Sequence, residues 1–291
     1  MRVLTAIVSS GRPHLLRLTT QWLFPLETPC HAAVFDDHPD SMASGVIDFL
    51  RMRGILLDQA DGGPEPRTLR ERASRCAAQR RRAVDWFLAD AGRGDILFLK
   101  DDDILMPMSA LTEAVEDLAF LNGTDYGANV AALTLHGFAG HTGGYIPSKG
   151  GKVFTRLRLS GEANVLLRYD ALRESGNRFD PAHEKGFADL QWQSFSAHGY
   201  SYMTRVWPPY EVQHLGFGPN GSRIHADEGH TPRWCAGPYE TYYLRRPKEV
   251  VPIQGFPLEQ FVQAAKVLGG EEAARQWLQE QNEVNDAKLN K

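Results

Sequence analysis

The chain has 291 residues, 42% of them hydrophobic, which is enough to bury a sizeable core as one large domain or two closely merged ones. Its formal net charge of -4 gives no global attraction to nucleic acids or anionic membranes. Three cysteines without a CxxC pair argue against a disulfide framework or a zinc ribbon, and no apolar run is long enough for a signal peptide or a membrane span, so we expect a soluble, cytoplasmic protein.

Strand and helix patterns alternate through the first hundred residues, which predicts an α/β fold built on a mostly parallel sheet. Apolar runs predict strands, and apolar residues spaced three and four apart predict helices. The predicted strands are Val3–Ser9, 32–35 and 55–57, and the predicted helices are 13–24, 41–53 and 68–91.

The helix predicted over 68–91 is rich in arginine. A solvated helix face accounts for most of these side chains. One or two could turn inward and bind phosphate oxygens, because a guanidinium group suits that geometry. The arginines are Arg70, Arg72, Arg75, Arg80, Arg81 and Arg82.

The most informative segment is DILFLKDDD, residues 95–103. Its apolar part predicts a buried strand, and the strand ends in Asp101, Asp102 and Asp103. Parallel strands in open α/β sheets end at a ligand crevice. Three adjacent carboxylates repel one another, and a divalent cation among them relieves that repulsion, with Mg2+ or Mn2+ preferred by oxygen ligands. The alternative is an acidic turn that precedes a helix entered at Pro107.

Further elements follow the acids. We expect a helix over 109–121 and a strand over 126–135, then a glycine-rich loop over 137–151 that forms either a flap over a ligand or an ordinary hairpin connection. An extended segment ends at Arg168, and a later strand closes on His214. Between them we expect a helix over 170–175 and a second that carries Glu184 and Asp189 near its start. Two short helices after residue 257 are expected to serve packing or oligomerisation.

Several of these segments, taken in order, resemble the GT-A glycosyltransferases, in particular the large family two of nucleotide-sugar transferases. The resemblance covers roughly residues 2–222. It rests on the turn SSGRP, the pair Asp36-Asp37, FLKDDDIL as the DxD segment, LLRYDALRESGNRFDP, FADLQWQSFSAHGY and VQHLGFGPNGS.

The resemblance implies a GT-A-like, Rossmann-type mixed and mostly parallel sheet flanked by helices, with a C-terminal helical extension. It assigns residues 1–105 to a nucleotide-sugar binding half and 106–240 to an acceptor and catalytic half of the same domain. Residues 241–291 would form the extension.

The resemblance also implies a metal-dependent inverting transfer of a sugar from a nucleoside-diphosphate donor, with a UDP-sugar favoured, to an acceptor hydroxyl. Mn2+ or Mg2+ would be held by Asp101, Asp103 and His214. Lys100 stands where many relatives have the first acid of the DxD segment, so the ligating pair is either Asp101 with Asp103 or Asp101 with Asp102. Asp189 would be the catalytic base, with Glu184 as the second choice.

Two further sets of residues follow from the resemblance. The donor would be bound by Ser9, Ser10, Arg12, Asp36, Asp37, Arg80, Lys100 and Asp102. The acceptor would be bound by Gly144, Tyr145, Arg168 and Trp192. Some alternatives stay open: Gln79 in place of Arg80, a plain turn at Asp36-Asp37, and core packing for Trp192.

Two other functions share the acids and the metal. A nucleotidyltransferase would release pyrophosphate, and a non-catalytic nucleotide or sugar-binding module would bind without turnover. The acceptor of a transferase could be a glycan, a small molecule, a protein or a modified DNA base, although the acidic net charge gives no support to a nucleic-acid acceptor.

Overall fold

The structure is a computed structural model, and it describes residues 1–9, 13–24, 31–37, 44–60, 69–123, 129–135, 138–148, 151–160, 164–182, 189–207, 210 and 212–214. Three predicted site residues, Ser10, Arg12 and Glu184, lie outside these ranges. The predicted C-terminal helices and the extension 241–291 also lie outside them.

The described helices and strands follow one another in an α/β order that agrees with most of the sequence prediction. In chain order they are β1 (Val3–Ser9), α1 (Pro13–Leu23), β2 (Ala32–Asp36), α2 (Ser44–Met52), β3 (Leu56–Gln59), α3 (Leu69–Asp90), β4 (Ile96–Asp101), β5 (Ile104–Leu105), α4 (Met108–Asn122), β6 (Val130–Thr134), β7 (Phe138–Pro147), β8 (Val153–Ser160), β9 (Asn164–Arg168), α5 (Tyr169–Ser175), α6 (Asp189–Ala197), β10 (Ser201–Trp207) and β11 (Gln213–His214).

Nine of these strands form one sheet in the order β3-β2-β1-β4-β9-β6-β10-β8-β7. The strands β3, β2, β1 and β4 are parallel neighbours, as in half of a Rossmann sheet. Only β8 and β9 run against the common direction of the described strands in this sheet. The predicted α/β fold with a mostly parallel, mixed sheet is therefore confirmed.

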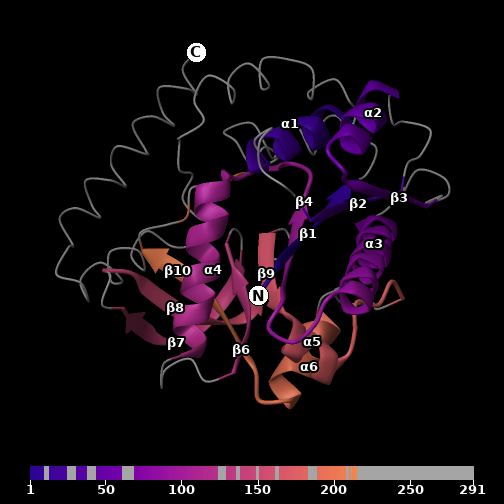
Figure 1. Cartoon of the computed structure of the whole chain (residues 1–291). Coiled ribbons are helices and arrows are strands. Elements are labelled where there is room, and N and C mark those ends of the chain that lie inside the picture. Colours follow the sequence, from indigo (N-terminus) through magenta and orange to yellow (C-terminus); the bar gives the residue numbers. More distant parts are fainter. Residues whose placement is uncertain are drawn as a thin grey trace, which may run out of the picture.

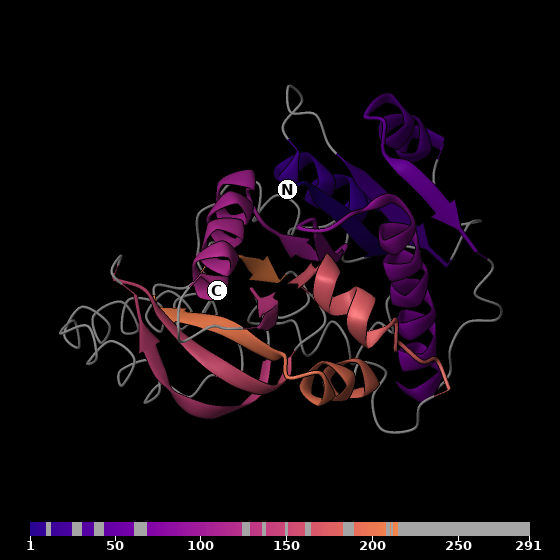
Figure 2. The same ribbon diagram turned by 60° about the horizontal axis from the view of Figure 1, so that its bottom comes forward.

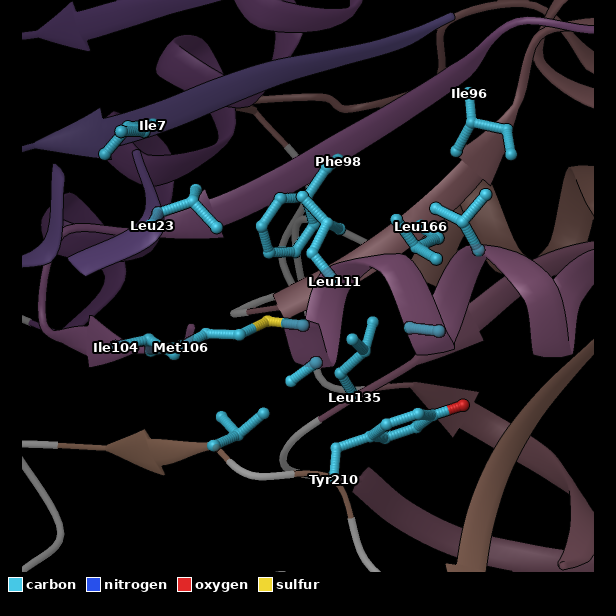
Figure 3. Close-up of a cluster of buried hydrophobic side chains, with 14 of the residues drawn as sticks. Ile7, Leu23, Ile96, Phe98, Ile104, Met106, Leu111, Leu135, Leu166 and Tyr210 are labelled. Carbon is cyan, nitrogen blue, oxygen red and sulfur yellow. The ribbon is translucent and has the colours of Figure 1, made fainter. Parts of the chain in front are cut away.

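Helices cover both faces of the sheet. Figure 1 and Figure 2 show α3, α5 and α6 together on one face, and α1, α2 and α4 on the other. Successive side chains of a strand point to opposite faces. In β4, Leu97 and Leu99 accordingly pack with α3, whereas Phe98 packs on the α4 side, where it lies beside Leu111 and Leu166 (Figure 3). Burying a side chain the size of Phe98 contributes about 3 kcal/mol.

The start of α4 follows a local sequence signal. Pro107 precedes the helix with φ -74°, a value that the proline ring favours. Proline also has no backbone N–H, so it leaves no unpaired donor at the start of the helix. Gly123 ends the helix, where its N–H donates to the carbonyl oxygens of Ala119 and Phe120 at 3.1 and 3.0 Å. The helix entry predicted at Pro107 is confirmed.

The glycine-rich segment 137–151 differs from its prediction as a loop. Residues Phe138–Pro147 form β7, which is paired with β8, so the segment is one arm of a hairpin at the edge of the sheet and not a flap. The register shifts between His141 and Tyr145, an irregularity that the glycines there can accommodate. The hairpin alternative is therefore the nearer one, but Phe138–Pro147 form a strand of that hairpin and not its connection, because backbone pairing to β8 outweighs the loop-like composition.

The predicted boundary between the two halves of the domain, at residues 105 and 106, separates strands that belong to one sheet. Strand β9 pairs with β4 along its length, from Arg168 opposite Ile96 to Asn164 opposite Lys100. The two predicted halves therefore share one sheet, and the boundary between them stays a prediction. No helix in the described ranges is both long enough and apolar enough to cross a membrane.

Candidate functional site

The candidate site lies at the edge of the sheet where β1, β2 and β4 end, here called the carboxyl edge. Strand β1 has β2 on one side and β4 on the other, so the strand order reverses between β1 and β4. Open α/β sheets bind ligands outside the strand ends at such a switch point. Ser9 ends β1 opposite Asp36, and Val8 is opposite Asp101, so two predicted donor residues and one predicted metal ligand lie together here.

Asp102 is turned toward the end of β1. Its backbone N–H donates to the carbonyl oxygen of Val8 at 3.1 Å, and its Oδ2 accepts a hydrogen bond of 2.9 Å from the hydroxyl of Ser9. The Asp102 side chain is fully buried. Asp102 therefore joins β1 to β4, and this position makes it a weaker candidate for a metal ligand than its neighbours.

Asp101 points to the other side of the same edge, where α3 meets it. The guanidinium of Arg80 donates to Asp101 Oδ1 at 2.7 Å, and Arg80 is only 3% exposed. Earlier in α3, Arg75 lies 3.9 Å from Oδ2 of Asp37, the residue directly after β2. Arginines on α3 thus balance the negative charge of the strand ends.

A polar stripe on α3 holds the carboxyl edge together. Arg75, Gln79 and Arg82 are spaced four and three apart, which places them on one side of the helix. Gln79 Nε2 donates to the carbonyl oxygens of Ser9 and, at 3.3 Å, Phe35. Arg82 donates to the carbonyl oxygen of Asp36 at 3.1 Å and to Asp58 Oδ1 at 2.7 Å.

The expectation of a mostly solvated arginine face therefore does not hold for Arg75, Arg80 and Arg82, whereas Arg81 is exposed. The sequence offers Gln79 only as an alternative to Arg80 for a contact with the donor. The spacing of Arg75, Gln79 and Arg82, read together with the acids at the strand ends, is the signal that could have identified this stripe.

Lys100 brings a positive charge into the acidic segment. Its side chain is fully buried, and Nζ donates to the carbonyl oxygen of Asp101 at 3.0 Å. Burial lowers the pKa of Lys100 to about 8, and the nearby carboxylates of Asp102, Asp103 and Asp101 oppose that shift. The ammonium group of Lys100 thus occupies the position where the resemblance leads us to expect the first acid of the DxD segment.

Asp103 and His214 are neighbours through their backbones. β5 begins directly after Asp103, and it pairs with β11 so that His214 lies opposite Ile104. Asp103 is 4% exposed. The His214 side chain is not among the described parts of the structure. The structure therefore brings the backbones of these two predicted ligands together.

The residues at the carboxyl edge fit a metal ion that a substrate helps to hold. Within the described part of the chain, no three His, Cys, Asp or Glu side chains converge on one point, so a complete protein cage is absent from that part. Mg2+ commonly takes only one or two carboxylates and completes its shell with substrate phosphates and water. Asp103 and Asp101 can supply such a partial set of hard oxygen ligands.

Other predicted residues lie away from the acids. Arg168 is opposite Ile96, at the far end of β4, and it donates to Asn122 Oδ1 at 2.8 Å. Trp192 is 1% exposed and packs on Tyr202 with 5.4 Å between ring centroids. These positions favour structural roles for both residues and do not support the predicted acceptor contacts.

Gly144 and Tyr145 lie in β7, which four strands separate from β4 in the sheet order. Four strands of the sheet therefore separate this predicted acceptor pair from the acids at the end of β4. Asp189 is the first residue of α6, but its side chain lies outside the description. Its predicted role as the base stays a prediction.

No family model and no curated protein matches the chain. Among solved structures, S. aureus TarS (residues 1–349) is similar at 13% identity with a TM-score of 0.42, over 72% of this chain and 59% of that chain. A197 from STIV is similar at 17% identity with a TM-score of 0.33, over 70% of this chain and 81% of that chain. Likenesses at this level carry no argument about function, and the resemblance to family two is not confirmed.

Proposed function

We propose that this chain is a metal-dependent inverting glycosyltransferase that moves a sugar from a nucleoside diphosphate to an acceptor hydroxyl. The observation that carries the proposal is the gathering of Asp101, Asp102 and Asp103 at the switch point between β1 and β4, with the backbone of His214 beside them. This arrangement follows the order of motifs in the sequence resemblance. A UDP-sugar is the favoured donor.

The nucleoside would lie over the end of β2. Asp36 and Asp37 are buried there, and a carboxylate at a strand end can accept hydrogen bonds from ribose hydroxyls or from a base. Ser9 and the α3 stripe hold the ends of β1 and β2 in place. The donor would thus meet a rigid edge, which limits the entropy lost on binding.

The diphosphate would lie near Asp103 and Asp101, which would hold Mn2+ or Mg2+. When bound, such a cation supplies charge neutralisation to the departing nucleoside diphosphate. Arg80 and Lys100 add positive charge at the same edge, and they offset the repulsion among the three aspartates before any ligand arrives. The folded chain can therefore hold Asp101, Asp102 and Asp103 close together without a bound metal.

Asp189 would act as the base. Its carboxylate takes the proton of the acceptor hydroxyl while the hydroxyl oxygen forms a bond to the anomeric carbon. The bond from that carbon to the diphosphate oxygen breaks, and the nucleoside diphosphate leaves with the electron pair. One displacement of this kind inverts the anomeric configuration, and it needs the base about 3 Å from the hydroxyl or one water away.

Thermal melting with UDP, GDP and TDP, each with and without Mn2+, tests the ligand class. A ligand that binds the folded state at 100 times its Kd adds about 2.7 kcal/mol of stability. We expect one nucleotide to raise the Tm in the presence of Mn2+. If none of the three raises it, the proposal fails.

Asp189→Asn tests the reaction. Nucleotide binding should survive in this variant while sugar transfer falls at least about 100-fold, as expected for the loss of a general base. Asp90→Asn is the control, because Asp90 is exposed at the C-terminal end of α3, and it should transfer like the wild type. Release of a nucleoside diphosphate separates this function from that of a nucleotidyltransferase, and turnover separates it from that of a binding module.

A further inference from the structure

Two buried polar side chains lie opposite each other beside Asp101, Asp102 and Asp103. Asn164 is the first residue of β9, and its register partner on β4 is Lys100. Both side chains are fully buried. Directly opposite residues in a sheet project to the same face, so the amide and the ammonium occupy the same side of the sheet at the carboxyl edge.

Neither side chain uses its full hydrogen-bonding capacity within the described chain. Asn164 Nδ2 lies 3.7 Å from the sulfur of Met106, and Asn164 Oδ1 has no hydrogen-bond partner among the described residues. Lys100 Nζ donates to the carbonyl oxygen of Asp101, which engages one of its three protons. A spare acceptor and spare donors therefore lie on neighbouring strands.

A buried oxygen without a partner destabilises the folded chain, because it gives up its hydrogen bond to water and gains none in return. Such a group in a folded protein needs an explanation, and a bound molecule is one. The chemistry of the pair selects the kind of molecule. The ammonium requires an acceptor and the amide oxygen requires a donor, and a hydroxyl group is both at once.

We infer that Lys100 and Asn164 form a subsite for a hydroxyl group of the donor sugar. Lys100 Nζ donates to the hydroxyl oxygen, and that hydroxyl donates to Asn164 Oδ1. An ionised phosphate oxygen cannot fill this subsite, because it has no proton for Asn164. The inference rests on the proposed function, and it places the sugar next to Asp101, where the diphosphate would end.

Asn164→Leu tests the subsite, because leucine has nearly the same size and lacks both polar groups. We would measure the Kd for UDP and for UDP-glucose, UDP-galactose and UDP-N-acetylglucosamine by calorimetry with Mn2+. The substitution should weaken binding of the UDP-sugars that the wild type binds by about 10-fold and leave the Kd for UDP within about 2-fold, because only the sugar contact is lost. The Tm without ligand should stay equal or rise.

Asn122→Leu is the matched control. Asn122 is the last residue of α4, and both polar atoms of its amide have partners: Nδ2 donates to the carbonyl oxygen of Leu118 at 2.8 Å, and Oδ1 accepts from Val130 N and Arg168 at 3.2 and 2.8 Å. Its replacement should lower the Tm and leave every Kd unchanged. Asn164→Ala serves as a second variant, with the same selective loss expected, if the leucine variant does not fold.

The possible failures can be distinguished. If wild-type protein binds none of the nucleotides, the proposed function and the subsite fall together. If the wild type binds them and Asn164→Leu binds the UDP-sugars equally well, water satisfies Asn164 and only the subsite is lost. An equal loss for UDP and UDP-sugars would also overturn the subsite, because the effect would then not depend on the sugar.

Discussion

His214 lies opposite Ile104 in the ladder of β11 and β5, and Ile104 directly follows Asp103. The chain that leads to His214 is anchored in the core by Tyr210 and Val212, both about 2% exposed. Figure 3 shows Tyr210 in the same buried cluster as Leu135 and Met106. The backbone of His214 is thus held next to Asp103, shortly after two buried residues.

A buried network holds Tyr210. Its hydroxyl donates to Asp117 Oδ2 at 2.8 Å, and the guanidinium of Arg205 lies 3.7 Å from the centre of its ring. Arg205 also pairs with Asp117 at 2.9 Å and Glu113 at 2.8 Å, and Lys152 pairs with both acids. The hydrogen bond from Arg205 lowers the pKa of Glu113, and burial raises the pKa of Tyr210.

Tyr210→Phe keeps the ring under Arg205 and removes the hydrogen bond to Asp117. Because Asp117 is buried, we expect a loss of about 1–3 kcal/mol in the free energy of unfolding, measured with urea. Amide hydrogen exchange should also become faster at residues 104–105 and 213–214. Tyr200→Phe is the control, since Tyr200 donates to the exposed Glu174, and it should leave the exchange at β5 and β11 unchanged. Unchanged exchange in Tyr210→Phe would show that Tyr210 does not anchor β11.

Arg80→Met removes the cation paired with Asp101. Loss of one partner of a buried ion pair lowers the free energy of unfolding by about 3–5 kcal/mol. We expect about 3 kcal/mol here, because the Asp101 side chain is 24% exposed. Arg51→Met is the matched change in an exposed pair, with side-chain exposures of 75% for Arg51 and 71% for Asp48, and it should have no measurable effect. Equal unfolding midpoints for both variants would mean that Arg80 does not stabilise the carboxyl edge.

Asp95 contributes to stability in a pH-dependent way. Burial by itself would raise its pKa, but the backbone N–H groups of Gly92 and Arg2 and the guanidinium of Arg2 outweigh burial, so that the pKa is lowered. A carboxylate whose pKa is lower in the folded state gives stability that is present above its unfolded pKa near 4 and lost as the pH falls through the folded pKa. Asp95→Asn should therefore lose less stability than the wild type between pH 7 and pH 3. If the stability of Asp95→Asn fell with pH as steeply as that of the wild type, the pH-dependent role of Asp95 would be contradicted.

Much of the first half of the fold could be predicted because local signals and tertiary packing agree there. Val3–Ser9 is a continuous apolar run, and in the structure it is a strand with a buried neighbour on each side. Pro107 precedes α4 with a φ of -74°, which its ring favours. The β7–β8 hairpin could be predicted only as one of two alternatives and only as a connection, because the glycines of 137–151 favour loops, and the strand character of Phe138–Pro147 comes from pairing with the strand that follows it.

The candidate site was only partly predictable for the same reason. Three adjacent aspartates after an apolar run indicated the strand end and its acids. Their individual partners depend on tertiary contacts: Ser9 for Asp102 and Arg80 for Asp101. The register that places Arg168 at the far end of β4 and Asn164 beside Lys100 is likewise invisible in the sequence, because it is set by sheet pairing.

Calorimetric titration of Mn2+ and UDP into wild-type protein and Asp103→Asn tests the central claim most directly, with Asp90→Asn as the control. If the strand-end acids share a cation with a diphosphate, each ligand tightens the binding of the other in the wild type, and this coupling of about 5–150-fold is lost in Asp103→Asn but kept in Asp90→Asn. The account is contradicted if Mn2+ and UDP bind independently, or if Asp103→Asn retains the full coupling.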